Sequence, residues 1–70
     1  FMRLSANDRR AQIVSRAVEI ARERGLSAVN AVSVADGQDF SVWTVRRYYH
    51  RREDLRNAVA VQLSVDLSAG

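Results

Sequence analysis

Residues 41–55 hold the side chains of this chain that are best suited to recognising a charged or planar ligand. The segment contains four arginines and three large aromatic residues, which are Trp43, Arg46, Arg47, Tyr48, Tyr49, Arg51 and Arg52. Arginine offers positive charge to phosphate groups and a planar fork of donors to the edges of guanine bases. The segment therefore favours recognition of DNA, provided that a folded scaffold makes these side chains project together.

The distribution of charge supports this interpretation more than its total does. All eleven basic residues are arginine, eight residues are acidic, and the net charge is +3. Residues 46–52 include four of the arginines and no acid, which indicates a basic patch. Arg22 and Arg24 share their segment with Glu19 and Glu23, so an ordinary solvated surface explains them equally well.

Catalytic and metal-binding chemistry lacks the residues that it needs. The chain has no cysteine and a single histidine, so neither a disulfide nor a thiolate metal site is available. Asp36 and Asp39 flank a glycine, but two loop carboxylates without further ligands are more often turn-forming residues. Ser41 has no nearby base except the distant His50, and no glycine-rich phosphate loop occurs. We expect no metal, no cofactor and no enzymatic activity.

The composition predicts one small all-α domain. Seventy residues without a proline and rich in alanine, valine and arginine suit a helical fold. A core of this size only just offsets the entropy of ordering the chain, so we expect association with a second copy to add stability. No apolar run approaches the roughly twenty residues that span a bilayer, and the apolar core of a secretion signal is missing. We therefore expect no membrane contact and a cytoplasmic location.

Hydrophobic spacing predicts a flexible arm, residues 1–6, followed by a domain at residues 7–70. Its four helices are expected at about residues 8–24, 30–37, 41–49 and 52–68. The first helix carries an apolar stripe formed by Ile13, Ala17, Ile20 and Ala21. Asn7 or Asp8 is expected to cap its start, and Gly25 to end it.

A short turn is expected to join the second and third helices. Asn30 is the predicted cap of the second helix, whose inward residues are Ala31, Val34 and Ala35. The turn begins near Gly37 or at Asp39, because both residue types tolerate a left-handed backbone. Phe40 follows as an apolar plug, and Ser41 is expected to cap the third helix through its hydroxyl group.

The two sides of the third helix differ because each residue rotates by about 100°. If Val45 faces inward, Ser41 and Tyr49 lie on the same side. Trp43, Arg46, Arg47 and His50 are then expected to point away. An exposed Trp43 suits contact with a thymine methyl group or with the DNA backbone. The alternative is that Trp43 folds over a neighbouring helix as part of the core.

The fourth helix has more apolar surface than one neighbour requires. Leu55, Val59 and Leu63 repeat every fourth residue, but residues 58–63 are apolar on more than one side. The surplus from Val59 to Leu67 is compatible with self-association, with packing onto another domain, or with a loosely ordered tail.

Together these segments resemble the N-terminal DNA-binding domain of TetR-family transcriptional repressors. Residues 17–25, Ala-Val-Glu-Ile-Ala-Arg-Glu-Arg-Gly, follow the first-helix pattern of that family. Residues 41–49, Ser-Val-Trp-Thr-Val-Arg-Arg-Tyr-Tyr, resemble its Ser-x-Gly-Thr-Leu-Tyr-x-Tyr-Phe motif, and Arg52-Glu53 stands where its Lys-Glu usually stands. The resemblance implies a homeodomain-like bundle of three helices, in which the second and third form a helix-turn-helix, plus a fourth helix.

The same resemblance implies which residues touch DNA. Base contacts are expected from Val42, Trp43, Thr44, Arg46 and Arg47. Phosphate contacts are expected from Asn30, Val32, Ser41, Tyr48, His50 and Arg52. Arg3, Arg9 and Arg10 could let the arm reach phosphate or a minor groove. Because Trp43 replaces a small residue of the family and Arg46 a tyrosine, the operator is expected to differ from typical family sites.

The sequence thus predicts a transcriptional repressor that binds a palindromic operator in double-stranded DNA as a homodimer, with its third helix in the major groove. A different class of function is a helical protein-interaction module that uses Trp43 and the arginine–aromatic cluster. Single-stranded RNA stacked on Trp43 and Tyr48 is a third possibility. The family's small-molecule domain has no counterpart in these 70 residues, so none is expected in this chain.

Overall fold

The protein is described by a computed structural model that covers residues 5–69, with side chains given for residues 5–67. Residues 1–4 of the expected arm, including Arg3, lie outside the described residues. Residues 5 and 6 do not belong to an arm, because Ser5 caps the first helix and Ala6 is its first residue.

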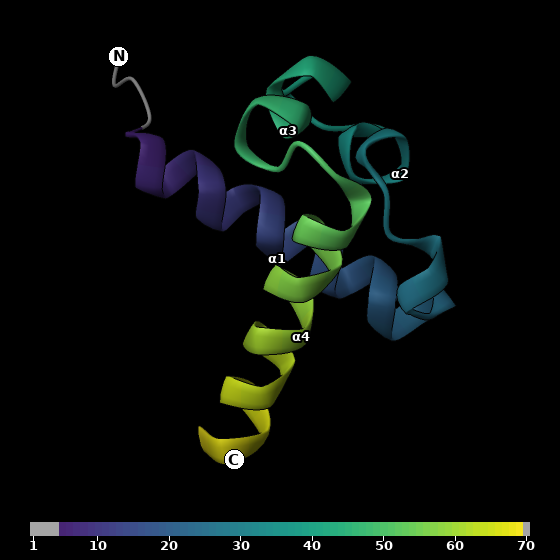
Figure 1. Ribbon diagram of the computed structural model, residues 1–70, viewed down its shortest axis with the longest axis vertical. Coiled ribbons are helices and arrows are strands. Elements are labelled where there is room, and N and C mark those ends of the chain that lie inside the picture. The colour runs from purple at the N-terminus through teal and green to yellow at the C-terminus, as the bar shows by residue number, and fades with distance from the viewer. Residues whose placement is uncertain (1–4, 70) are drawn as a thin grey trace.

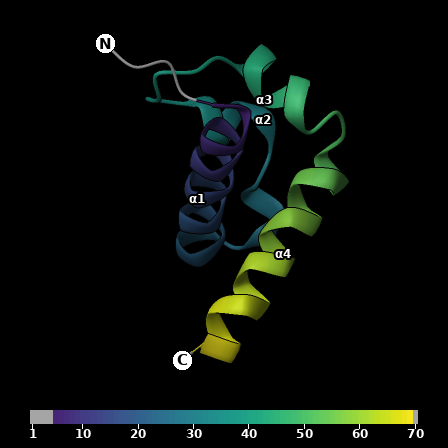
Figure 2. The same cartoon turned by 90° about the vertical axis from the view of Figure 1, so that its left-hand side faces the viewer.

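The all-α fold is confirmed as a small bundle of four α-helices and one 3₁₀ helix in the described part of the chain. The elements are α1 (Ala6–Arg24), η1 (Leu26–Ala28), α2 (Ala31–Ala35), α3 (Val42–Tyr48) and α4 (Arg52–Ala69). α1 contacts α4, η1 and α2, and α2 contacts α3. The short helices α2 and α3 lie together at one end, and the C-terminal half of α4 extends away from them (Figures 1 and 2). No helix within residues 5–69 is long and apolar enough to cross a membrane.

α1 begins earlier than the residue 8 that we predicted. The Ser5 hydroxyl oxygen accepts a hydrogen bond from the Asp8 backbone N–H at 3.1 Å, which makes Ser5 the cap in place of Asn7 or Asp8. All three residue types are good caps, so local preference alone does not choose among them. The predicted end is correct, because Gly25 follows Arg24 with a φ of 93°.

The predicted caps of α2 and α3 are confirmed. Asn30 and Ser33 form a reciprocal capping box, with the Asn30 side chain accepting from the Ser33 N–H at 2.9 Å. The Ser41 hydroxyl accepts from the Thr44 N–H at 3.2 Å. α2 ends at Ala35, short of residue 37, because Gly37 takes up a φ of 73° and turns the chain.

α3 is likewise shorter than the predicted 41–49, since Ser41 and Tyr49 flank it as caps. Of the two residues expected to begin the turn before it, Gly37 is the left-handed one. Asp39 is not, because no described residue other than glycine has a positive φ.

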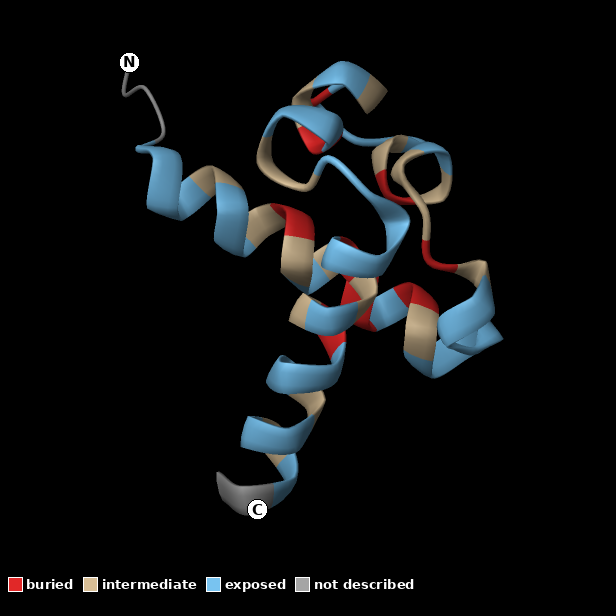
Figure 3. Cartoon of the chain, in the orientation of Figure 1, coloured by how far each residue is buried: buried red, intermediate tan, exposed pale blue. Residues whose placement is uncertain are grey.

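The core lies where α1 meets the other helices (Figure 3). Its buried side chains are Ile13, Ala17, Val18, Ile20, Val29, Val34, Phe40, Val45, Leu55 and Val59. Ser41, which was expected to share the inward side of Val45, is exposed, because it caps α3 from outside the helix. Every other predicted inward residue either belongs to this cluster or packs against it half-buried, as Ala21, Ala31, Ala35, Tyr49 and Leu63 do. Burial of Phe40 and Val45 in this core holds the end of the turn and α3 on the bundle, so the outer side of α3 has a fixed orientation.

Polar contacts fix the turn and α4 against the rest of the bundle. Asp39, in the turn between α2 and α3, accepts a hydrogen bond from the Gln12 side chain at 2.8 Å and lies 3.5 Å from the Arg9 guanidinium. Arg56 of α4 donates to the backbone carbonyl of Ser27 at 3.0 Å and more weakly to that of Val29 at 3.4 Å. The first set of contacts holds the turn against α1, and the second holds α4 against residues 27–29. In both sets the partners lie far apart in the sequence.

Candidate nucleic-acid interface

The two sides of α3 have opposite environments. Val45 is fully buried, whereas 76% of the Trp43 surface is exposed. The prediction of an exposed Trp43 is therefore confirmed, and the alternative in which Trp43 packs into the core is wrong. Arg46, one turn further along, lies over the Trp43 ring with its guanidinium carbon 5.9 Å from the ring centroid. This cation–π contact places a charged group and a large planar group side by side on the solvent-facing side of α3.

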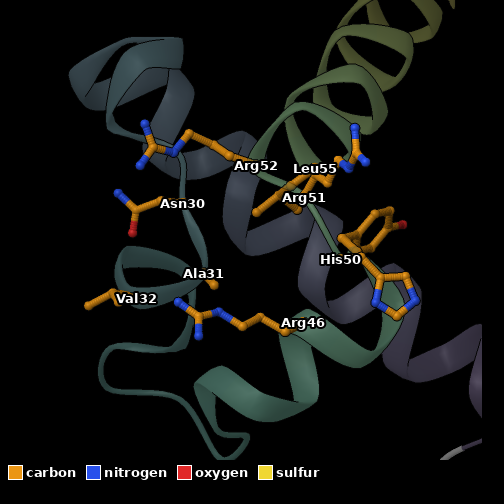
Figure 4. A pocket seen from close by; sticks show the side chains of 9 residues that line it. Asn30, Ala31, Val32, Arg46, His50, Arg51, Arg52 and Leu55 are labelled. Atoms are coloured by element: carbon orange, nitrogen blue, oxygen red, sulfur yellow. The ribbon is translucent and has the colours of Figure 1, made fainter.

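A basic cleft of about 430 Å³ opens where the start of α2, the end of α3 and the start of α4 meet. We call it the α2–α3–α4 cleft. Its lining residues are Asn30, Ala31, Val32, Arg46, Tyr49, His50, Arg51, Arg52 and Leu55. The side chains of Arg46 and Arg52 extend toward the side on which Asn30 lies, whereas His50 and Arg51 lie on the other side (Figure 4). Three guanidinium groups therefore line one cleft, and no carboxylate does.

Among residues 5–67, no ion pair neutralises the arginines of α3 or those at positions 51 and 52. The ion pairs among residues 5–67 join Arg9 with Asp39, Arg16 with Glu19, and Arg22 with Asp66. None of them includes Arg46, Arg47, Arg51 or Arg52, which are all exposed. The nearby Asp54 carboxylate accepts from the Arg51 backbone N–H at 3.3 Å, which satisfies a backbone donor at the start of α4.

The residues expected to read bases do not share one environment. Trp43 and Arg47 are exposed, and Val42 and Thr44 are half-buried at the first turn of α3. Arg46 is exposed as well, but it lines the α2–α3–α4 cleft and Arg47 does not. Arg46 and Arg47 are adjacent in the sequence, but only Arg46 faces the other cleft residues.

The residues expected to bind phosphate fall into two groups. Asn30, Val32, His50 and Arg52 line the α2–α3–α4 cleft together. Ser41 does not line it, and its hydroxyl lies 3.2 Å from that of Thr44 while it caps α3. The Asn30 amide is also engaged, since its oxygen caps α2. The residues that the sequence predicts to bind phosphate do not include Arg51, although Arg51 lines the cleft. Its place in the acid-free run of residues 46–52 could have indicated it.

Tyr48 and Tyr49 lie next to the N-terminal part of α1. Tyr48 is half-buried, and the Arg10 guanidinium carbon lies 5.6 Å from its ring centroid. Burial raises the pKa of the Tyr49 hydroxyl above its ordinary value of 10.0, while the positive charge of Arg10 opposes that shift. Arg10 thus belongs to α1 and contacts α3, where we had expected it to serve an arm.

Arg9 of α1 also contacts other residues of the bundle. It lies over the Phe40 ring at 5.7 Å and beside Asp39, so it holds the turn against α1. As for other kinds of site, no three His, Asp or Glu side chains among the described residues gather in a way that could hold a metal ion.

A comparison of the chain with models of known protein families, with curated proteins and with solved structures finds no match. Assignment of a function therefore depends on the residues and geometry of the site itself.

Proposed function

We propose that this protein is a sequence-specific regulator of transcription that binds double-stranded DNA with α3 in the major groove. The observation that carries the proposal is the outer side of α3. It presents an exposed Trp43 together with Arg46 and Arg47, which form no ion pair within the described part of the chain, while the buried Val45 holds the helix on its scaffold. An exposed tryptophan does not help this small core, whereas apolar and guanidinium groups together are suited to thymine methyl groups and guanine edges.

The division of contacts along the interface follows from position. Trp43 and Arg47 are exposed and lie outside the α2–α3–α4 cleft, so we assign them to bases, together with Val42 and Thr44 of the same first turns. The cleft residues Arg52 and His50 are assigned to the phosphate backbone, which attracts cations without regard to sequence. Tyr48, at the edge of the interface, offers its hydroxyl to a phosphate oxygen.

We further propose a helix-turn-helix module of the TetR type that acts in the cytoplasm as a repressor. The support for it is the resemblance of residues 41–49 to the motif of that family and the short turn that joins α2 to α3. Such modules bind palindromic sites as dimers whose half-sites lie about 34 Å apart. Val61, Val65 and Leu67 are exposed on α4, which supports a homodimer because apolar side chains gain stability when a partner covers them.

Selection of bound duplexes from a random pool tests the proposal. An enriched palindrome would reveal the operator, the half-site spacing and the dimer together. On that operator we expect Arg47→Ala to cost about 1–3 kcal/mol and to relax preference at one base position. The matched control is Arg24→Ala, an exposed arginine at the end of α1, which should leave the preference unchanged. If no sequence is enriched, specific DNA recognition is wrong.

The second candidate function is a helical protein-interaction module, which the exposure of Trp43 and Val32 supports. Tryptophan and arginine dominate the energetics of protein interfaces as well. The two functions differ in their response to salt. DNA binding should weaken steeply between low and moderate salt because counterions are released, whereas a complex built on Trp43 should depend weakly on salt and exclude duplex binding.

A further inference from the structure

The α2–α3–α4 cleft concentrates positive charge without a compensating acid. Arg46 of α3, Arg52 of α4 and Arg51 from the segment between them line one hollow with His50. A cleft lined by one sign of charge focuses the electric field and raises the local concentration of ions of opposite charge. Because no described ion pair includes these arginines, the charge of the cleft is suited to an anion.

The size of the cleft indicates a ligand larger than one small ion. Its volume of about 430 Å³ lies within the roughly 300–1,000 Å³ typical of small-molecule sites. A water molecule takes up about 30 Å³ in the liquid, so the cleft has room for several linked polar groups.

The placement of the cations indicates how such a ligand would be held. Arg46 and Arg52 reach toward one side of the cleft, and Arg51 and His50 lie on the other (Figure 4). Guanidinium groups bind phosphate oxygens through two parallel hydrogen bonds. We infer that the α2–α3–α4 cleft binds a ligand with two or more linked phosphate groups, and that Arg46 is a phosphate ligand, unlike its neighbour Arg47.

Linked phosphates occur both in the backbone of a duplex and in a free oligophosphate compound, and the chemistry of the cleft suits either source. Binding of a free oligophosphate does not depend on the proposed DNA function, so the two proposals can fail separately. A free compound of this class would also compete with the backbone for Arg46 and Arg52, which would make it a regulator of duplex binding.

The chain contains its own reporter for the cleft. Trp43 is the single tryptophan, and Arg46, which lines the cleft, lies over its ring. An anion that draws Arg46 toward Arg52 changes the surroundings of the indole. We therefore expect the fluorescence of Trp43 to change when the cleft is occupied.

The test is a titration of the 70-residue protein with inorganic triphosphate, followed by Trp43 fluorescence and by calorimetry. Sodium sulfate at matched ionic strength is the control for screening. Calorimetry is then repeated with Arg46→Ala, Arg52→Ala and, as a matched variant outside the cleft, Arg47→Ala. Loss of one charged hydrogen-bonding partner should weaken triphosphate binding about tenfold in the first two variants and leave it nearly unchanged in the third. Circular dichroism checks that each variant is folded.

The same variants are titrated with a duplex to separate the two sources of phosphate. If triphosphate binds through Arg46 and Arg52, the cleft is a site for free oligophosphates, even when no duplex binds. If only the duplex binds, and Arg46→Ala weakens all sequences alike, the inference holds with DNA as the source. The inference is overturned if sulfate has the same effect as triphosphate, or if Arg47→Ala weakens triphosphate binding as much as Arg46→Ala does.

Discussion

Three arginines of α1 differ in their contacts from the arginines at the junction of α3 and α4. Arg9, Arg16 and Arg22 of α1 each lie beside a carboxylate, and Arg9 and Arg22 thereby connect α1 to the turn and to α4. Arg46 and Arg52 have no ion-pair partner among the described residues and line a cleft without acids.

The difference teaches that the distribution of acids decides what an arginine does. An arginine next to a carboxylate has its charge satisfied within the protein and helps to connect helices. An arginine whose neighbours are other arginines keeps an unsatisfied charge, and a phosphate group supplies what the protein does not. Two of the four predictions that follow test this contrast, and the other two test the half-buried side chains of Arg56 and Tyr49.

The largest effect is expected from removing two arginines of the junction. Arg47→Ala combined with Arg52→Ala should lower affinity for the operator at least about thirtyfold, since each contact contributes roughly 1–3 kcal/mol. Unfolding free energy should change by less than about 0.5 kcal/mol, because both side chains are exposed. Electrophoretic mobility shifts and urea unfolding measure the two quantities.

The control for that experiment removes the same amount of charge from α1. Arg16→Ala combined with Arg22→Ala should leave most of the operator affinity intact. An equal loss of affinity in both double variants would mean that only net charge matters, and the contrast between the two regions would be wrong.

A smaller effect, on stability alone, is expected for Arg56→Ala. This substitution removes the donor that joins α4 to the backbone carbonyls of Ser27 and Val29. Loss of charged donors to two carbonyls should lower the unfolding free energy by about 1–2 kcal/mol. Urea unfolding followed by circular dichroism measures the change, with Arg51→Ala as a neighbouring control that should be nearly neutral. Equal stability of the two variants would contradict the structural role of Arg56.

The ion pair between Arg22 and Asp66 should contribute less still. Its side chains are 60% and 40% exposed, so water and salt screen the attraction. A double-mutant cycle with Arg22→Ala and Asp66→Ala should give a coupling of about 0.2–1 kcal/mol that declines as salt is added. A coupling that does not respond to salt would show that the contact is not mainly electrostatic.

The smallest effect concerns alkaline pH. Because burial raises the pKa of Tyr49 above 10.0, its protonated form is favoured in the folded state relative to the unfolded state. Its contribution to stability is complete below the ordinary pKa and is lost as pH rises through the raised pKa. Urea unfolding between pH 9 and pH 11.5 should therefore show a decline that is shallower in Tyr49→Phe. An identical decline in both proteins would exclude Tyr49 as its cause.

Much of the fold is accessible to sequence reasoning because its signals are local. The caps Asn30 and Ser41 act on backbone groups three residues away, and the inward side of α3 follows from helical rotation once Val45 is placed. Where several local choices are equivalent, as at the start of α1, the same reasoning selects the wrong residue. Val18 and Val29 are buried but stand outside the predicted stripes, since only their neighbours in space show that they belong to the core.

The candidate site was predicted in part. The exposure of Trp43 was predictable, because it depends on the geometry of one helix. The separation of Arg46 from Arg47 was not, because it depends on where α2 and α4 lie around the end of α3. The structural roles of Gln12 and Arg56 were equally inaccessible, since their partners Asp39 and Ser27 are 27 and 29 residues away.

By itself, the sequence determined the four α-helical segments, the caps of α2 and α3, the end of α1, and the concentration of charge and aromatic surface from Ser41 to Leu55. These properties follow from side-chain rotation and from hydrogen bonds that span one helical turn. Only the tertiary structure decided that residues 30–32 meet residues 46–55 around one basic cleft. Those segments are held together by the core and by the contacts of Arg9, Gln12 and Arg56. The sequence does not specify this arrangement, because packing energy depends on residues that are neighbours in space and distant along the chain.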